Sequence, residues 1–431
     1  MITISILTVK ETEETDKISR PQRPIELSQY PDVDPERAWE LANLIRIAAR
    51  DYQCFNDWFN NVTEQDKGEP VYKEFTLEKD RKLEGISQEN NNSWIYTSKE
   101  INNSTIQEYT LLTESDVNNQ DSQFPDEQYY KYKILKTYEH LAYYPTKLDI
   151  DIDRFGFIAE RKEGNKIIVF LVFRGTRELG EWFNNAQFKQ VDFLAREEDD
   201  DGIEGYGKIS LGFNKMYTGF RPGIFIDYGV LNAISRTGDS IIRNILNRID
   251  DVKITYKSIY QAVNEYFSNL DTNEDVNIYV TGHSLGGALA TIATMHIAEK
   301  DQLKTPINLY SFASPRVGDN SFADKFNQLS SDKIKAFRFA NSEDLVTKIP
   351  LPIWFKAGLD LDNSPLLDLT RTTFNTVTGG IFDKDYQHVG FPVYFTHQAR
   401  RFNKTGNLEE TATVGDNHNM TSSYCGALEQ K

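Results

Sequence analysis

One stretch of this 431-residue chain constrains its fold more than any other, the run from Val276 to Ala290. Its first part, 276–280, is mostly apolar and contains β-branched and aromatic residues, which is typical of a buried strand. Gly-His-Ser-Leu-Gly follows at 282–286, and small residues at helical spacing come next. The sequence therefore predicts a strand, a sharp turn and a helix in immediate succession. The glycines are expected where strand and helix nearly touch.

Ser284 stands at the centre of this turn, in a G-x-S-x-G pattern that holds a serine hydroxyl clear of a sheet. The following helix begins beneath it, so the helix dipole and the amide of Leu285 face any negative charge that develops on a bound carbonyl. We therefore expect Ser284 to be a nucleophile. The alternative, a chance glycine-rich turn, does not account for the strand before it or the alanine-rich helix after it.

A serine hydroxyl is a weak nucleophile unless a histidine takes its proton and an acid orients that histidine. In hydrolases with this turn, the acid and then the histidine follow the serine along the chain. Asp344 lies just past the predicted strand 335–340, and the neighbouring Glu343 is an alternative acid. His388 and His418 both come later, so chain order does not choose between them. His388 precedes an apolar run typical of a strand, whereas His418 lies in a polar stretch typical of a loop.

Strands alternate with helices over much of the chain. This alternation predicts an α/β fold with a mostly parallel central sheet flanked by helices. The expected strands are 155–160, 167–173, 276–280, 307–312 and 335–340. The expected helices are 35–62, as one long helix or two, 256–270 and the one after Ser284. We divide the chain into an N-terminal helical and polar extension (1–149) and a catalytic domain (150–431). Polar residues 63–130 and two segments, 219–250 and 351–382, are interpreted as insertions.

Composition excludes some classes of partner. The net charge is −17, which argues against a nucleic-acid partner and against steady attraction to anionic lipid. No run approaches the roughly 18 apolar residues of a membrane span, and the first residues form a poor signal peptide. Cys54 and Cys425 are far apart and imply no disulfide framework. These observations predict a soluble, cytoplasmic protein, and serine chemistry of this kind needs no metal or cofactor.

Five segments together resemble the class 3 lipase family, that of the fungal triacylglycerol lipases and their plant and bacterial relatives. They are Val172–Thr176, Glu181–Asn185, Gly282–Gly286, Ala313–Asp319 and the segment around Asp344. The resemblance covers about 150–425. It implies an α/β-hydrolase fold with a serine, aspartate and histidine triad.

The resemblance also implies roles for single residues. The triad acid falls on Asp344, and the histidine falls on His418, in the segment Asp416–Tyr424. Thr176 becomes the oxyanion-hole residue through its backbone amide and hydroxyl, and Leu285 supplies the second amide. Trp182 and Phe183 lie where the family has the hinge and start of a lid, so they are expected to cover the acyl site.

The resemblance finally implies a function: hydrolysis of carboxylic esters of lipids, triacylglycerol or another glycerolipid, through an acyl-enzyme on Ser284. The expected partner is a lipid ester substrate, with transient contact at a lipid interface and no nucleic acid. Two other hypotheses stay open. One is a catalytically inactive lipase-like module for interaction or sensing, and the other is an esterase for small soluble esters.

Overall fold

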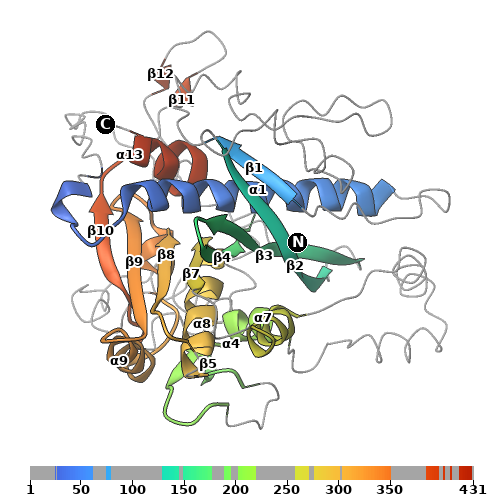
Figure 1. Ribbon diagram of the computed structural model, residues 1–431. Helices are drawn as coiled ribbons and strands as arrows, with labels where there is room; N and C mark the ends of the chain where they lie inside the picture. Colours follow the sequence, from blue (N-terminus) through green and yellow to red (C-terminus); the bar gives the residue numbers. More distant parts are fainter. Residues whose placement is uncertain are drawn as a thin grey trace, which may run out of the picture.

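An eight-stranded sheet forms the centre of the molecule, in the order β1-β2-β3-β4-β7-β8-β9-β10 (Figure 1). The computed structural model describes residues 25, 27–61, 74–78, 129–144, 149–176, 189–195, 202–219, 258–270, 276–300, 303–350, 385–397, 401–402, 408–409 and 417–429. The strands are β1 (Glu74–Glu78), β2 (Tyr129–Tyr144), β3 (Asp149–Glu163), β4 (Lys166–Phe173), β7 (Val276–His283), β8 (Ile307–Phe312), β9 (Ile334–Asn341) and β10 (Phe391–Phe395).

The sheet has an antiparallel part and a parallel part. β1 to β4 pair antiparallel, whereas β4, β7, β8, β9 and β10 run parallel to one another. The register places Phe173 of β4 beside Gly282 of β7, and Phe312 of β8 beside Phe339 of β9. The carboxyl ends of these strands therefore meet at one edge of the sheet, where open α/β sheets bind their ligands. This confirms the predicted mostly parallel sheet.

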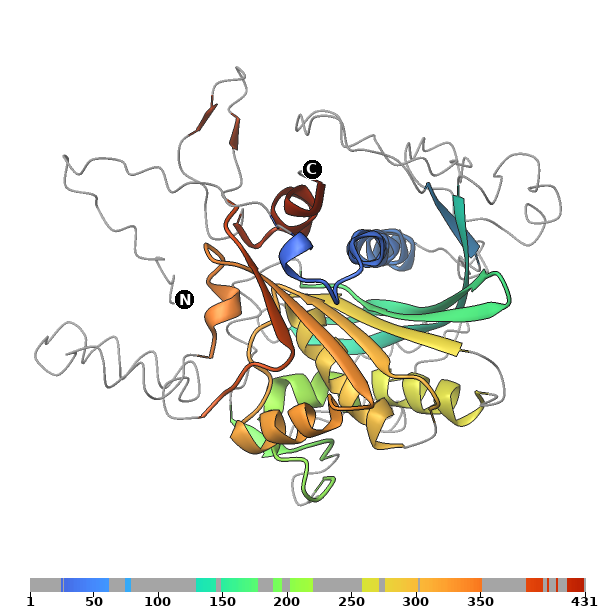
Figure 2. The ribbon, with the colours of Figure 1, turned by 60° about the vertical axis from the view of Figure 1, so that its left-hand side comes forward.

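Within the described residues, four helices cover one face of the sheet. They are α4 (Leu211–Thr218), α7 (Ile259–Ser268), α8 (Leu285–Glu299) and α9 (Asn320–Leu329) (Figure 2). α8 is buried along almost its whole length, which explains its run of small and apolar residues. α7 begins at Ser258, whose hydroxyl accepts from the Gln261 amide in a capping box.

The opposite face carries α1 (Pro35–Asn61), beside the π-helix η4 (Met420–Cys425) and α13 (Gly426–Glu429) (Figure 2). The predicted helix at 35–62 is a single helix. A buried ion cluster fastens it to the sheet, because the Glu40 carboxylate pairs with Arg37 and with Arg161 and accepts the Tyr132 hydroxyl. Burial, together with Glu40, raises the pKa of Tyr132 well above its usual range.

The antiparallel part of the sheet is more extensive than the sequence predicts. β3 begins at Asp149 rather than 155, and β2, which the sequence did not indicate, pairs with it over most of its length. α1, β1 and β2 come from the predicted extension, 1–149, yet they join the same sheet and its cover. The boundary between extension and catalytic domain stays a prediction.

Shorter elements complete the description: η1 (Leu27–Gln29), β5 (Gln190–Asp192), β6 (Lys208–Ser210), η2 (Val346–Lys348), β11 (Arg401–Phe402) and β12 (Leu408–Glu409). Most of the predicted insertions at 63–130, 219–250 and 351–382 lies outside the described residues. Across the described ranges, no helix is both long enough and apolar enough to cross a membrane.

Candidate active site

Ser284 occupies a strained turn between β7 and α8. Its backbone has φ 59° and ψ −125°, and its amide donates to the Phe312 carbonyl of β8 at 2.9 Å. A β-carbon built on Gly282 would lie 2.1 Å from the Gly286 carbonyl oxygen. Strand and helix therefore touch at these two glycines, as expected. We call residues 282–286 the elbow.

The end of β4 crosses the start of α8 directly beside the elbow. A β-carbon on Gly286 would lie 2.4 Å from the Arg174 carbonyl, and one on Gly175 would lie 3.2 Å from Ser284 Cβ. Thr176 follows, and its buried hydroxyl oxygen has no hydrogen-bond partner within the described residues. The Leu285 amide belongs to the first turn of α8, where amides lack acceptors inside the helix. The structure thus brings the two predicted oxyanion residues to the serine.

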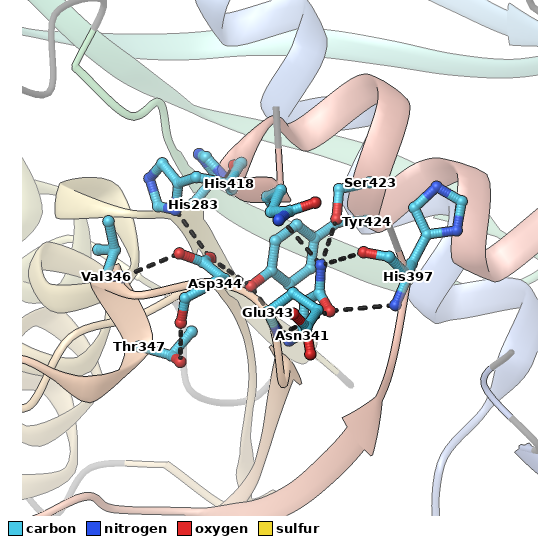
Figure 3. Close-up of polar contacts among 11 residues, drawn as sticks. His283, Asn341, Glu343, Asp344, Val346, Thr347, His397, His418, Ser423 and Tyr424 are labelled. Carbon is cyan, nitrogen blue, oxygen red and sulfur yellow. Dashed lines mark hydrogen bonds and ion pairs between the residues drawn. The ribbon is translucent and has the colours of Figure 1, made fainter. Parts of the chain in front are cut away.

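Asp344 is fully buried in the loop after β9, residues 342–350, which we call the acid loop. Three donors meet its carboxylate. The Val346 amide donates to Oδ1 at 2.9 Å, while the Tyr424 hydroxyl donates to Oδ2 at 2.7 Å. His418 Nδ1 lies 2.8 Å from the same Oδ2 (Figure 3). The carboxylate that meets His418 is therefore that of Asp344 and not that of Glu343. Hydrogen bonds to a buried carboxylate hold it in one orientation.

The two candidate histidines have different surroundings. His418 is 4% exposed, and its Nε2 is buried without a hydrogen-bond partner in the described part of the chain. His388 instead donates from Nε2 to the Thr347 carbonyl at 2.8 Å. Burial, with Arg338 and Arg316 nearby, lowers the pKa of His388 well below its usual range. The structure brings His418 to the acid, and places His388 behind the acid loop.

His283, the residue before the serine, contacts the predicted base. Its Nε2 donates to the His418 carbonyl at 2.7 Å, and the two rings lie 4.6 Å apart between centroids. Burial, and then the proximity of His418, lower the pKa of His283 well below its usual range, so the ring is neutral. A neutral ring that donates from Nε2 has no proton on Nδ1. The residue before the serine therefore holds the backbone of the predicted base.

Asn341, at the end of β9, joins three segments of the site (Figure 3). Its Nδ2 donates to the carbonyls of His397 (2.7 Å) and Asn417 (3.2 Å) and to the Ser423 hydroxyl (3.0 Å). Its Oδ1 accepts from the amides of Glu343 and His397. The acid loop, the end of β10 and the segment of the predicted base are thereby fixed to one another. No pattern in the sequence indicated this role.

Two predicted residues, Trp182 and Phe183, lie outside the described residues. Among the residues that the structure does describe, no group of three or more histidine, cysteine, aspartate or glutamate side chains could hold a metal ion. The site that remains consists of Ser284, Asp344, His418, Thr176 and the Leu285 amide.

Part of this arrangement has counterparts among known proteins. The family model described as Lipase (class 3) matches residues 170–354, from β4 through the elbow to the acid loop. This match confirms the resemblance to the class 3 lipase family. Relatives of the chain include phospholipase A1-II 1 of Oryza sativa subsp. indica, 36% identical over 48% of this chain and 47% of the relative. Another is phospholipase A1-Igamma3, chloroplastic, of Arabidopsis thaliana, 28% identical over 58% of this chain and 40% of the relative. The chain thus spans less than half the length of these two relatives.

Solved lipase structures resemble the chain more weakly. The triacylglyceride lipase of Rhizomucor miehei is 19% identical, with 68% of this chain and 83% of that chain covered and a TM-score of 0.32. A TM-score of 0.32 is too low to assign the fold by superposition. The α/β-hydrolase fold of the chain rests instead on the parallel strands β4 to β10, the helices on both faces and the elbow between β7 and α8.

Proposed function

We propose that this chain is a serine hydrolase that cleaves carboxylic esters of glycerolipids through an acyl-enzyme on Ser284. One observation carries the proposal. His418 is bound to Asp344 through Nδ1, and its other nitrogen is buried without a partner in the described residues. Its carbonyl is held by His283, the neighbour of a strained serine whose own hydroxyl oxygen is also buried and without a partner there. Such a set is suited to moving a proton between serine and histidine.

The proposed reaction has two halves. Ser284 Oγ attacks the ester carbonyl carbon while His418 Nε2 takes the hydroxyl proton, and Asp344 stabilises the resulting imidazolium. The amides of Thr176 and Leu285 and the Thr176 hydroxyl donate hydrogen bonds to the carbonyl oxygen as it becomes negatively charged. The alcohol then leaves with the proton from His418. Water, activated by His418, attacks the acyl-enzyme, releases the fatty acid and restores Ser284.

The substrate class follows from the family and its relatives. The plant relatives carry the name phospholipase A1, so we propose glycerophospholipid first and triacylglycerol second. Ser284 is only 1% exposed, so a lipid ester reaches it only after a rearrangement, which we propose to occur at a lipid interface. The lid role of Trp182 and Phe183 and the cytoplasmic location stay predictions.

A fluorophosphonate probe tests the nucleophile and the base, because it reacts only with an activated serine. We expect labelling of the wild type and of a control variant, His296→Asn, which removes a buried histidine of α8 outside the site. Ser284→Ala and His418→Ala should be folded by circular dichroism and unlabelled. Labelling of a folded His418→Ala variant, with loss of labelling in a folded His388→Ala variant, would show that His388 is the base. An unlabelled, folded wild type would favour the inactive module.

Turnover then separates a lipase from an esterase. Rates on phosphatidylcholine, on a triacylglycerol emulsion and on a soluble short-chain nitrophenyl ester are compared below and above the concentration at which each substrate aggregates. We expect the rate on lipid to rise once an interface forms. A rate that saturates smoothly below that concentration, with none on lipid, would instead establish an esterase for small soluble esters.

A further inference from the structure

Arg316, Arg338 and His388 form a cluster of basic side chains behind the acid loop. Phe337 and Phe339 of β9 belong to the core on the α1 face. Because side chains alternate along a strand, Arg338 lies on the opposite face of the sheet. Arg316 follows β8, and its amide donates to the Ile349 carbonyl at 2.8 Å. None of these three residues takes part in the reaction proposed above.

Two of the three side chains are anchored on carbonyls of the acid loop. Arg316 Nη1 donates to the carbonyl of Lys348 and, at 2.6 Å, to that of Pro350. His388 Nε2 donates to the Thr347 carbonyl at 2.8 Å. These anchors use one nitrogen of each side chain. The rest of the Arg316 guanidinium and His388 Nδ1 are left without protein partners in the described ranges.

Arg338 is the most buried member, at 5% exposure. Its Nη2 donates to the Tyr394 hydroxyl at 3.1 Å, and its buried Nε has no hydrogen-bond partner within the residues described. Arg37, Arg154 and Arg161 are also buried, and each of them forms an ion pair with a carboxylate. In the same part of the chain, neither Arg316 nor Arg338 has a carboxylate partner.

Arg338 is buried and Arg316 half-buried, and a buried charge without a counter-ion is costly, so this arrangement favours an anion. The pKa of Arg316 reflects this cost. Burial, and then Arg338, lower the pKa of Arg316 to about 10. The protein as a whole carries a net charge of −17, so a local excess of positive charge does not follow from its composition.

We propose that Arg316, Arg338 and His388 bind a phosphate group that retains a P–O–H, as in inorganic phosphate or a phosphate monoester. Two guanidinium groups match the charge and the several acceptor oxygens of phosphate. His388 donates from Nε2 and is neutral, so its buried Nδ1 is an acceptor. Hydrogen phosphate supplies the matching O–H donor, whereas a phosphodiester has none. The source is either free phosphate or the headgroup of a phosphomonoester lipid.

Calorimetric titration of the full chain at pH 7 tests this proposal, with ionic strength matched by sodium chloride. Inorganic phosphate is compared with dimethyl phosphate, which lacks the O–H. We expect phosphate to bind at least about tenfold more tightly than dimethyl phosphate, since one side-chain nitrogen would otherwise stay unpaired. Binding that is absent for phosphate, or equal for the two ligands, would overturn the proposal whatever the variants do.

Three variants assign the binding to the cluster. Arg338→Met should weaken phosphate binding at least about tenfold, because it removes a charged donor. Lys335→Met removes an exposed charge from the same strand and should leave the dissociation constant within about twofold. His388→Leu removes both the donor toward Thr347 and the Nδ1 acceptor, so it should lose the preference for phosphate over dimethyl phosphate. Retention of that preference would refute the assignment even if Arg338→Met does not fold.

Vesicles distinguish the two sources. Phosphatidylcholine vesicles with added phosphatidic acid, a monoester, are compared with vesicles holding phosphatidylglycerol, a diester. Sedimentation with phosphatidic acid alone, lost in Arg338→Met, assigns the site to a lipid headgroup. Binding of inorganic phosphate without sedimentation assigns it to free phosphate. These measurements report binding, so their failure leaves the proposed hydrolysis intact, and failure of hydrolysis leaves them intact.

Discussion

The contact between His283 and His418 makes a sharp prediction about turnover. The His283 ring donates to the carbonyl of the proposed base at 2.7 Å, with the two residues 8% and 4% exposed. His283→Leu removes the donor while keeping an apolar side chain of similar bulk. His283→Gln is the matched control, because the amide nitrogen of glutamine stands close to the position of histidine Nε2.

The magnitude follows from the carbonyl that loses its partner. A buried acceptor left without a hydrogen bond costs about 1–3 kcal/mol. This corresponds to about 5- to 150-fold in an equilibrium or a rate. Since the same carbonyl belongs to the proposed base, the cost falls on the position of its ring. We expect kcat of His283→Leu to fall about 10- to 100-fold with KM within about twofold, and His283→Gln to keep kcat within about threefold.

The assay is steady-state hydrolysis of a soluble ester, with urea unfolding of each variant measured in parallel. The unfolding free energy of His283→Leu should lie about 1–3 kcal/mol below that of His283→Gln. Equal kcat in the two folded variants would refute the idea that His283 positions the base. Equal kcat with unequal stability would limit its role to the fold.

Three further predictions concern stability. Burial, and then Lys300, lower the pKa of His296 to about 3, so the unfolded chain binds one more proton than the folded chain as the pH falls below about 6.5. This histidine therefore has no effect on stability above that pH and lowers it by about 2 kcal/mol at pH 5, so between pH 7 and pH 5 His296→Asn should lose about 2 kcal/mol less unfolding free energy than the wild type in urea. Gly282→Ala should fail to form the elbow, with loss of probe labelling, because the new carbon would lie 2.1 Å from the Gly286 carbonyl. Glu40→Leu leaves two buried guanidinium groups without their shared carboxylate and should lower the unfolding free energy by about 3–5 kcal/mol.

The centre of the sheet is readable from the sequence because helices cover both of its faces. β4 is then an almost continuous apolar run, and β7, β8 and β9 are rich in apolar residues. β8 has the predicted bounds, 307–312, while β4 begins one residue earlier than predicted. β2 was missed for the opposite reason. Its residues mix tyrosine and lysine with apolar side chains, and its stability depends on its pairing with β3 rather than on its own pattern.

Some residues of the candidate site could likewise be predicted from the sequence, and its other contacts could not. The serine lies in a local motif, and the acid lies in a loop after an apolar strand, so both positions are visible in the chain. The contacts around them are not visible, because they join distant segments. Asn341 bonds to Ser423, 82 residues away, and nothing next to Asn341 in the sequence indicates that partner. The basic cluster behind the acid loop was likewise missed, because its members come from three separate segments.

The position of His418 along the chain also sets the order in which the site is assembled during synthesis. The ribosome delivers the elbow first and the acid loop next, and residues 417–424 emerge later than both. Until those residues join the fold, Asp344 lacks the donors from His418 and Tyr424, and Asn341 lacks its bonds to Asn417 and Ser423. A nascent chain therefore carries a serine that has no partner to activate it. In the proposed reaction, ester cleavage begins only once η4 has docked, so a chain without residues 417–424 should leave lipid esters intact.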